Sequence, residues 1–312
     1  MVDTSTLIVR GPETVTWRVV LDPLMMVAGV RALMLQALQP TTMRGVWQNS
    51  DFLEEPLERL FNTAHFVTVT ALGTPEQADA LGARVRGVHR ALRIKDPDTG
   101  RTHRVDEPEL LLWVHCAEVS SYLEVIERGG VRLTPAERDR YYDEQRRTAT
   151  YVGLHEEDVP GSVAEMSAYF DRARAELDLR VIPESRATMR FLLWPKMPRK
   201  LRMLAPFKPL WVPVGMLAYY TLPRWARDEY RTLPEVPGVQ PLVTIGLKAG
   251  RFLVGLIPEK ITGRPFKPET RELMADLPRR LAESGVRPQR RLQKIRVAEV
   301  AEGSPGLRPG RR

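Results

Sequence analysis

The sequence predicts an all-α protein built as a single helical bundle. Apolar residues recur at three- and four-residue intervals along most of the 312 residues, and Pro, Gly, Asp and Ser gather in short stretches between these segments. Runs in which polar and apolar residues alternate, the pattern of half-buried strands, are scarce. With 43% hydrophobic and 28% charged residues, the chain has enough material to bury a large core.

The expected helices are marked by end signals as well as by periodicity. A Ser, Thr or Asp followed three residues later by Glu indicates a helix N-terminus, because the two side chains cap free backbone N–H groups. Gly129 and Gly130 mark the end of the helix that begins near Asp106. The pairs with the N-terminal signature are Asp106 with Glu109, Thr134 with Glu137 and Ser162 with Glu165. Other helices are expected over residues 23–38, 56–72, 75–94, 184–193, 239–256 and 268–283.

The formal net charge of +8 is concentrated towards the end of the chain. Beyond residue 285 only Glu299 and Glu302 balance the basic residues, and Gly and Pro are frequent, so we expect a disordered tail over 286–312. The helical domain is expected over 14–285, after an N-terminal extension over 1–13. Such a tail is more often a solvated chain end than a specific binding surface. We therefore expect no specific nucleic-acid partner, while weak association with a membrane surface stays open. The basic residues of the tail are Arg287, Arg290, Arg291, Lys294, Arg296, Arg308, Arg311 and Arg312.

Cysteine content and the first residues indicate a cytoplasmic protein, with peripheral membrane attachment as an alternative. Cys116 is the only cysteine, which excludes internal disulfides and the thiolate clusters of zinc and iron-sulfur centres. Residues 1–10 lack the basic and apolar pattern of a signal peptide, and no run reaches the roughly 18 apolar residues of a membrane span. The sequence does not predict an oligomeric state.

Two neighbouring rows of side chains run along the helix expected over 75–94. The row expected to face the core carries Leu81, Val85, Val88 and Leu92. The row beside it carries Gly82, Arg86, His89 and Arg93. A neutral imidazole can bind haem iron, and guanidinium groups bind the carboxylates of haem, so His89 between two arginines is suited to a haem site. By spacing alone, a histidine among helical arginines is more often a surface or packing residue.

The helix expected over 56–72 offers a possible partner surface. Arg59, Thr63, Phe66 and Thr70 follow one another at intervals of three or four, so they share one face. A cation and a hydroxyl in an apolar pocket could orient dioxygen or hold a cofactor carboxylate. The alternative is that Arg59 pairs with a nearby glutamate on the surface and Thr63 only packs.

His115 is expected inside the bundle, where it either lines the pocket or makes a core hydrogen bond. His65, His103 and His155 have no partner that their spacing reveals. The signatures of zinc proteases, phosphate-binding loops, dinucleotide-binding folds and serine hydrolases are absent.

The segment over 191–230 is rich in aromatic rings and is interrupted by prolines. Such material could line a hydrophobic entrance or rest on a membrane surface. The alternative, which we favour, is that the rings close the core beneath a helix broken by proline.

An ordered series of motifs resembles the rubber oxygenase and MpaB-type oxygenase family, long known as a domain of unknown function. The resemblance covers about residues 14–260 and is densest over 45–175. The series is far more specific than any of its members. Its motifs include Thr16-Trp17-Arg18 with Asp22-Pro23, Asn49-Ser50-Asp51-Phe52, Arg59-Leu60-Phe61-Asn62-Thr63, Arg84-Val85-Arg86-Gly87-Val88-His89 and Asp96-Pro97.

The resemblance implies a globin-like helical fold around a b-type haem, with His89 as the iron ligand. It also implies that Arg86 and Arg93 accompany this ligand, and that Arg59 and Thr63 lie on the opposite side of the haem as catalytic candidates. His115 is expected to line or support the same pocket.

Two departures from the family pattern bear on the substrate. Latex-clearing members carry a lysine where this chain has Asn62, and many relatives carry a histidine where it has Gln39. Rubber is therefore not the expected substrate. No carboxylate base can be assigned, since Asp22 and Asp51 are candidates by composition only.

Together these features predict a haem b-dependent oxygenase that acts with dioxygen on a hydrophobic substrate, of isoprenoid or unsaturated lipid character. A haem-binding carrier or sensor without catalysis is one alternative. A haem-free helical interaction protein that kept the fold is the other.

Overall fold

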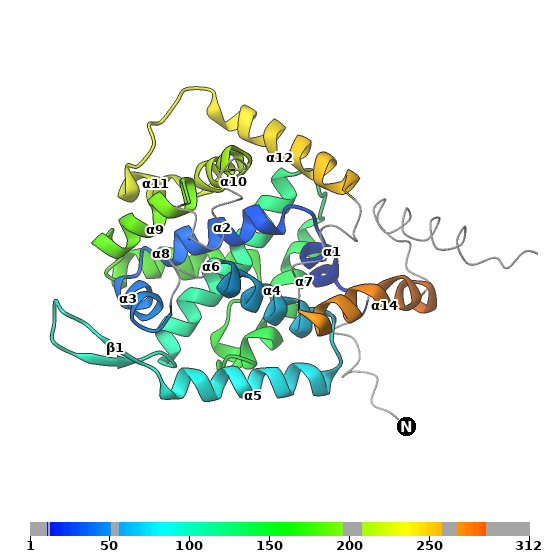
Figure 1. Ribbon diagram of the computed structural model, residues 1–312, viewed down its shortest axis with the longest axis horizontal. Helices are drawn as coiled ribbons and strands as arrows, with labels where there is room; N and C mark the ends of the chain where they lie inside the picture. The colour runs from blue at the N-terminus through cyan, green and yellow to red at the C-terminus, as the bar shows by residue number, and fades with distance from the viewer. Residues whose placement is uncertain (1–10, 12, 51–55, 196–207, 258–266, 285–312) are drawn as a thin grey trace, which may run out of the picture.

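A computed structural model describes residues 11, 13–50, 56–195, 208–257 and 267–284. Helices dominate it (Figure 1), so the all-α prediction is confirmed, while the globin-like arrangement and the domain boundaries stay predictions. The predicted tail over 286–312 lies outside the described residues. The elements are α1 (Val15–Val20), α2 (Met25–Gln36), α3 (Pro40–Gln48), α4 (Pro56–Leu72), α5 (Pro75–Ala91), β1 (Arg93–Lys95), β2 (Thr102–Arg104), α6 (Pro108–Arg128), α7 (Pro135–Thr150), η2 (Glu156–Asp158), α8 (Val163–Glu176), α9 (Pro183–Leu193), α10 (Lys208–Thr221), α11 (Arg224–Tyr230), α12 (Val239–Leu256) and α14 (Pro268–Ser284).

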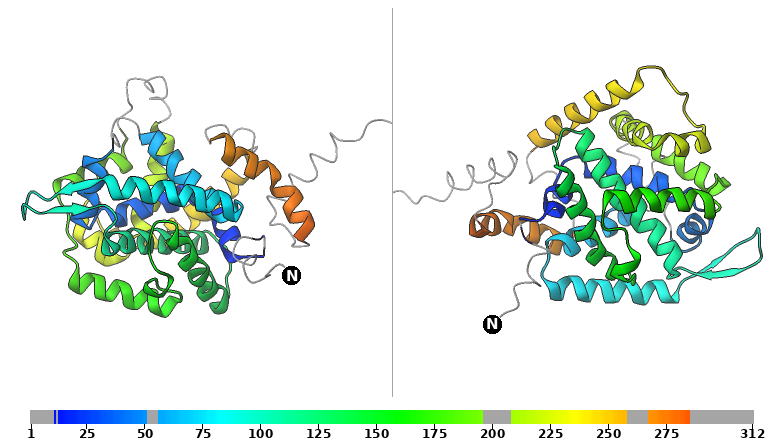
Figure 2. Two further views of the ribbon diagram at one scale, coloured as in Figure 1. Left: turned by 90° about the horizontal axis from the view of Figure 1, so that it is seen from below. Right: turned by 180° about the vertical axis from the view of Figure 1, so that it is seen from behind.

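The core forms where α2 packs between α6 and α10. α6 buries side chains on all of its faces, and α5 and α12 run along opposite edges of the molecule in the front and back views (Figures 1 and 2). Arg31 of α2 is buried and ties the three central helices together. Its Nε donates to the carbonyl of Thr221 at 3.0 Å and its Nη1 to Oγ of Ser121 at 2.5 Å. Burial lowers the pKa of Arg31 to about 10, so the guanidinium remains charged at neutral pH.

Most of the predicted helix ends are confirmed. Complete capping boxes form at Thr74 with Gln77 and at Thr134 with Glu137, and Gly130 takes a φ of 101° just past the end of α6. The prediction that Asp106 caps α6 is wrong. The helix begins at Pro108, whose fixed φ suits the first helical position, and the Asp106 carboxylate instead accepts from the Arg104 guanidinium at 2.7 and 2.5 Å.

α5 ends three residues earlier than predicted. Leu92 has extended backbone angles, φ −81° and ψ 145°, because the chain turns there into β1. Arg93 therefore lies in a strand, and the prediction that it continues the helical row of His89 is wrong.

The inward face of α5 is shifted relative to the prediction, and Leu81, Val85 and Leu92 are only partly buried. Val88, expected to face the core, is 51% exposed, whereas Ala78 and Gly82 are buried. A Cβ at Gly82 would lie 3.0 Å from the ring of Tyr151. Small residues thus let α5 approach the end of α7 closely, and the row of His89 faces inward.

The β1–β2 hairpin follows α5 and is tied to α3. Ile94 of β1 is buried, and the backbone N–H and carbonyl of Lys95 bind the Gln48 side chain at 2.8 and 2.7 Å. Arg44 of α3 is buried and forms an ion pair with Asp96, the residue that follows β1. The hairpin therefore holds the end of α5 against α3.

α1 is capped by a carboxylate from α7. Glu144 accepts from the backbone N–H of Val15 at 3.2 Å and of Thr16 at 2.8 Å, and from Oγ1 of Thr16 at 2.8 Å. These N–H groups have no partner within the helix, so Glu144 satisfies them and fixes α1 against α7.

In the described part of the aromatic segment over 191–230, most of the rings close the core, which is the alternative that we favoured from the sequence. Tyr219, Tyr220 and Tyr230 are buried in the main core cluster, and Trp211 is partly buried against it, while Trp194 is 55% exposed. Within the described ranges, no helix combines the length and apolarity needed to cross a membrane.

We expect Glu144→Ala to lower the free energy of unfolding by about 3 kcal/mol, because it leaves the buried N–H groups of α1 without an acceptor. Urea denaturation followed by circular dichroism measures this change. Asp143→Ala, which removes a neighbouring carboxylate with a 69% exposed side chain, is the matched control and should cost less than about 0.5 kcal/mol. Equal effects of the two variants would contradict the capping role.

Candidate functional site

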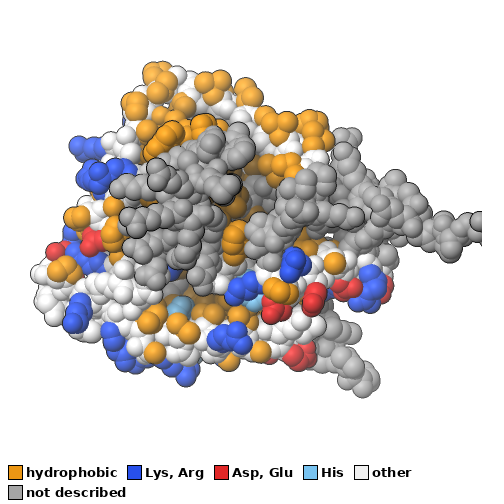
Figure 3. Space-filling model, in the orientation of Figure 1, with side chains coloured by type: hydrophobic (Ala, Val, Ile, Leu, Met, Phe, Trp, Pro, Cys, Tyr) orange, Lys and Arg blue, Asp and Glu red, His pale blue; other side chains and the backbone are white. Residues whose placement is uncertain are grey.

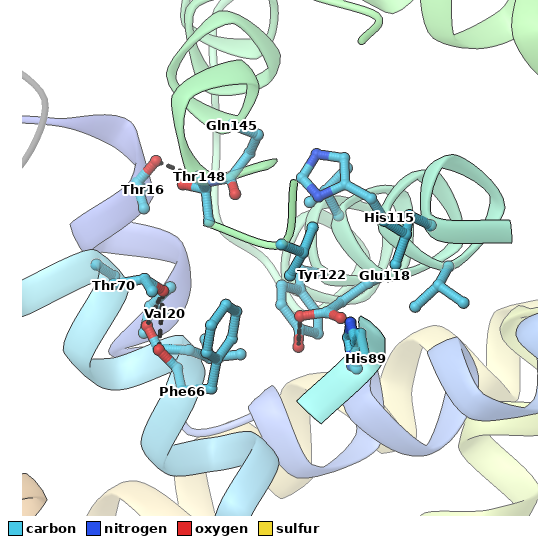
Figure 4. A pocket seen from close by; sticks show the side chains of 16 residues that line it. Thr16, Val20, Phe66, Thr70, His89, His115, Glu118, Tyr122, Gln145 and Thr148 are labelled. Carbon is cyan, nitrogen blue, oxygen red and sulfur yellow. Dashed lines mark hydrogen bonds between the residues drawn. The ribbon is translucent and has the colours of Figure 1, made fainter. Parts of the chain in front are cut away.

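A cavity opens between α1, α4, α5, α6 and α7 (Figure 4). Its volume is about 80 Å³. Most of the lining is apolar, with histidine, glutamate, tyrosine and a few hydroxyl and amide groups between. The lining residues are Thr16, Val20, Phe66, Val67, Thr70, Ala71, His89, Leu111, Val114, His115, Glu118, Val119, Tyr122, Gln145, Thr148 and Val152.

His89 enters the cavity from the inward row of α5 (Figure 4). Its Nδ1 is buried and has no hydrogen-bond partner among the described residues. Burial lowers the pKa of His89; the Asp106 carboxylate opposes this shift and the Arg59 guanidinium adds to it. The imidazole is therefore neutral at pH 7 and has a lone pair available for a ligand.

His115 reaches the same cavity from α6. It is buried, its Nε2 has no hydrogen-bond partner among the described residues, and burial lowers its pKa to about 4. The core hydrogen bond considered as an alternative from sequence is thus not formed by this atom. Two neutral imidazoles from different helices line one cavity (Figure 4), each with an unsatisfied buried nitrogen.

Glu118 is a site residue that the sequence analysis missed, and that analysis assigned no role to Tyr122. Tyr122 Oη donates to Glu118 Oε1 at 2.7 Å, and no ion pair with Glu118 occurs within the described part of the chain. Burial raises the pKa of the Glu118 carboxyl, and the hydrogen bond from Tyr122 opposes this shift. Both lie on the row of α6 that contains His115, at spacings of three and four, so the helical period could have revealed them.

Three of the remaining polar side chains of the lining, Thr16, Thr70 and Gln145, make hydrogen bonds within the walls. Gln145 Nε2 donates to Oγ1 of Thr16 at 2.9 Å, and Thr70 Oγ1 donates to the Phe66 carbonyl at 2.8 Å. These bonds hold the walls together. The two histidines and Glu118 are therefore the groups best placed to bind a ligand.

The two residues predicted for the far side of the haem lie on α4. Arg59 is partly buried, donates to Oγ of Ser50 at 3.2 Å, and contributes to the electrostatic environment of His89. Thr63 is exposed and does not line the cavity. Phe66 and Thr70, predicted to share their face, do line it.

The two arginines predicted to flank His89 make different contacts. Arg86 Nη1 donates to the Tyr151 carbonyl at 3.2 Å, next to the place where α5 meets the end of α7. Arg93 is exposed in β1 and donates to the carbonyls of Arg90 and Leu92 at 2.6 and 3.0 Å. Arg86 therefore stays in the row of His89, whereas Arg93 lies outside it and binds its own backbone.

The structure also describes Asp22, Gln39 and Asn62, which the sequence analysis discussed in relation to the site. Asp22 is buried, and its carboxylate accepts from the Leu24 N–H at 3.0 Å and from Arg251 Nε at 2.7 Å. Gln39 caps α3 through Thr42, and Asn62 is exposed. Asp51 lies outside the described residues.

A family profile described as "ER-bound oxygenase mpaB/B'/Rubber oxygenase, catalytic domain" matches residues 17–243. The chain belongs to this family. The profile covers most of the sequence and all of the lining residues except Thr16, so the family suggested by the sequence motifs is confirmed. Comparisons with curated proteins and with solved structures gave no match.

The family is defined by an oxygenase catalytic domain, and oxygenase is therefore the general activity class of the chain. Within the part of the chain that the structure describes, no three His, Cys, Asp or Glu side chains gather as a metal site. The cavity with His89, His115 and Glu118 is the candidate site of the MpaB and rubber oxygenase domain.

We expect His115→Gln to reduce the acid sensitivity of the fold. The pKa of His115 is about 4 in the folded protein and about 6.5 when unfolded, so the unfolded chain binds more protons between these values. Stability is therefore full above the unfolded pKa and falls as the pH drops towards the folded pKa. Between about pH 7.5 and about pH 5, wild type should lose roughly 2 kcal/mol more than the variant in urea denaturation. His155→Gln, in an exposed turn, should behave as wild type, and an equal loss in His115→Gln would contradict the assignment.

Glu118→Gln should leave the thermal midpoint unchanged or raise it at about pH 8, because a neutral amide avoids the burial of a carboxylate and still accepts from Tyr122. The folded pKa of Glu118 is raised, so its stability penalty grows as the pH rises above the ordinary glutamate value of about 4.5. Differential scanning fluorimetry measures the midpoint. A fall of several degrees would show that the carboxylate serves the fold and not the site.

Proposed function

We propose that the chain is a haem b-dependent oxygenase in which His89 is the iron ligand. The observation that supports this most directly is the pair of unsatisfied, neutral imidazole nitrogens in one largely apolar cavity of an oxygenase domain. Haem iron takes its protein ligands from single side chains such as histidine, and haem itself supplies the other nitrogens.

The residues of the site fit haem in their chemistry. Arg86 lies on α5 with His89 and Arg59 lies on α4, and a guanidinium is suited to a haem carboxylate through charge-assisted hydrogen bonds. We assign Arg93 the same role, which requires it to leave its contacts with Arg90 and Leu92. The cavity is smaller than the roughly 300 Å³ of small-molecule sites, so we infer that its walls move apart when haem binds.

When bound, haem would supply the redox chemistry with dioxygen. The chain's own contribution is to hold the group and to shape a dry pocket. His115 is proposed to support the pocket, and Glu118 with Tyr122 would hold a proton at Oε1 or Oη near the substrate. Thr63 and Arg59 are the proposed contacts on the side opposite His89, and this role requires α4 to present Thr63 to the bound molecules.

The proposed substrate is hydrophobic, of isoprenoid or unsaturated lipid character, because most of the lining is apolar. Dioxygen is the proposed co-substrate. Asn62 stands where latex-clearing relatives carry a lysine, so rubber is not proposed. We place the protein in the cytoplasm, with peripheral attachment to a membrane.

We expect purified protein, expressed with a haem precursor, to show a Soret band at one haem per chain. His89→Ala should lose the band or weaken haem binding by roughly a factor of 100, because the iron would lose the imidazole nitrogen that the proposal assigns to it. Visible absorption and haemin titration measure both effects. His155→Ala, which removes an exposed histidine far along the chain, is the matched control and should keep the wild-type spectrum.

The same purified protein also distinguishes the oxygenase from the carrier or sensor and from the helical interaction protein. Oxygen uptake with isoprenoid or unsaturated lipid substrates would support the oxygenase. A stable haem spectrum without uptake for any such substrate would favour a carrier or sensor. A folded, colourless protein that binds haemin no better than His89→Ala does would overturn the haem proposal and favour a helical interaction protein.

A further inference from the structure

The outer face of α12 carries a row of exposed apolar side chains. They follow one another at intervals of mostly three and four, with Ala249 completing the row, so they share one face of the helix. Figure 3 shows hydrophobic side chains along the edge of the molecule over α12. The side chains, each between 52 and 66% exposed, are Leu242, Ile245, Phe252, Leu253 and Leu256.

The inner face of α12 is the one that attaches the helix to the bundle. Val243 and Leu247 are buried in the main core, and Arg128 of α6 donates to the Thr244 hydroxyl at 3.3 Å. Arg251 pairs with the buried Asp22 at 2.7 Å. The outer row is therefore not required for this attachment, and contiguous exposed apolar surface of this kind marks an interaction site.

The charges of α12 indicate which partner fits. The helix contains no acidic residue, and its exposed cation is Lys248, since Arg251 is paired with Asp22. Two copies of this face packed about a twofold axis would bring their Lys248 side chains together without an acidic partner on the helix, which opposes self-association. An anionic lipid surface offers both an apolar layer for the row and negative headgroups for Lys248.

We propose that the outer face of α12 docks on an anionic membrane surface and inserts its apolar row between the lipid headgroups. The basic sequence beyond residue 285 adds attraction of the same sign. The docking surface is distinct from the cavity, so this inference does not depend on haem.

Vesicle flotation of the full-length chain tests this inference. Vesicles of phosphatidylcholine with about one third phosphatidylserine should carry the wild-type protein, and pure phosphatidylcholine should carry much less. The double variant Ile245→Gln, Phe252→Gln should reduce partitioning by at least about tenfold, because two exposed anchors lose their transfer free energy. Val163→Gln, which makes the same kind of change at a 43% exposed site on α8, is the matched control and should float as wild type does.

Three results would overturn the docking surface. One is a wild-type chain that stays off the anionic vesicles. Another is a double variant that floats as well as wild type, or a control that loses as much. The third is sedimentation velocity showing a wild-type dimer that the double variant converts to monomer, since a second copy would then cover α12. Circular dichroism of the variants establishes that each is folded.

Discussion

The burial of α6 on all of its sides is the constraint on which the rest of the structure depends. A helix that is apolar around its circumference has to be surrounded. α2 covers one face, where Arg31 joins it to Ser121, and α1, α4, α5 and α7 border another. These neighbours do not fill the space along the row of Leu111, His115, Glu118 and Tyr122. The cavity is thus a product of the same packing that makes the core.

Most of the long helices and the two histidines could be predicted because the three- and four-residue spacing of apolar side chains can be read from the sequence. It did not find α1, α3 or the β1–β2 hairpin, which are short and depend on distant contacts such as Glu144 with Thr16. The difference between the predicted and the observed inward face of α5 has another cause. Residues such as Gly82 count little as apolar, yet close packing selects them, so the row with larger side chains was wrongly assigned to the core. Glu118 was missed although it follows His115 by three residues on the same row of α6.

Polar groups are treated differently in the core and in the cavity. In the core, Arg31 and Glu144 bind partners on neighbouring helices. In the cavity, the nitrogens of His89 and His115 stay unsatisfied, at a cost of about 1–3 kcal/mol for each buried group. Thr42 Oγ1 and Arg44 Nε, outside the cavity, are also without a partner among the described residues. The two histidines differ from them in that both line one cavity, where a ligand would compensate the cost.

The connection between α5 and its hairpin limits how this domain can vary in length. Leu92 joins the helix to β1, and β1 is tied to α3 through Gln48 and the Arg44–Asp96 ion pair. Because both ends are fixed, a one-residue deletion before Leu92 would rotate the preceding helix by about 100° and carry His89 out of the cavity. The hairpin tip is also held, since Asp98 pairs with Arg44 and Arg180, but the length of the tip does not set the rotation of α5. Insertions and deletions among relatives that keep the site should therefore gather at the tip and spare the junction.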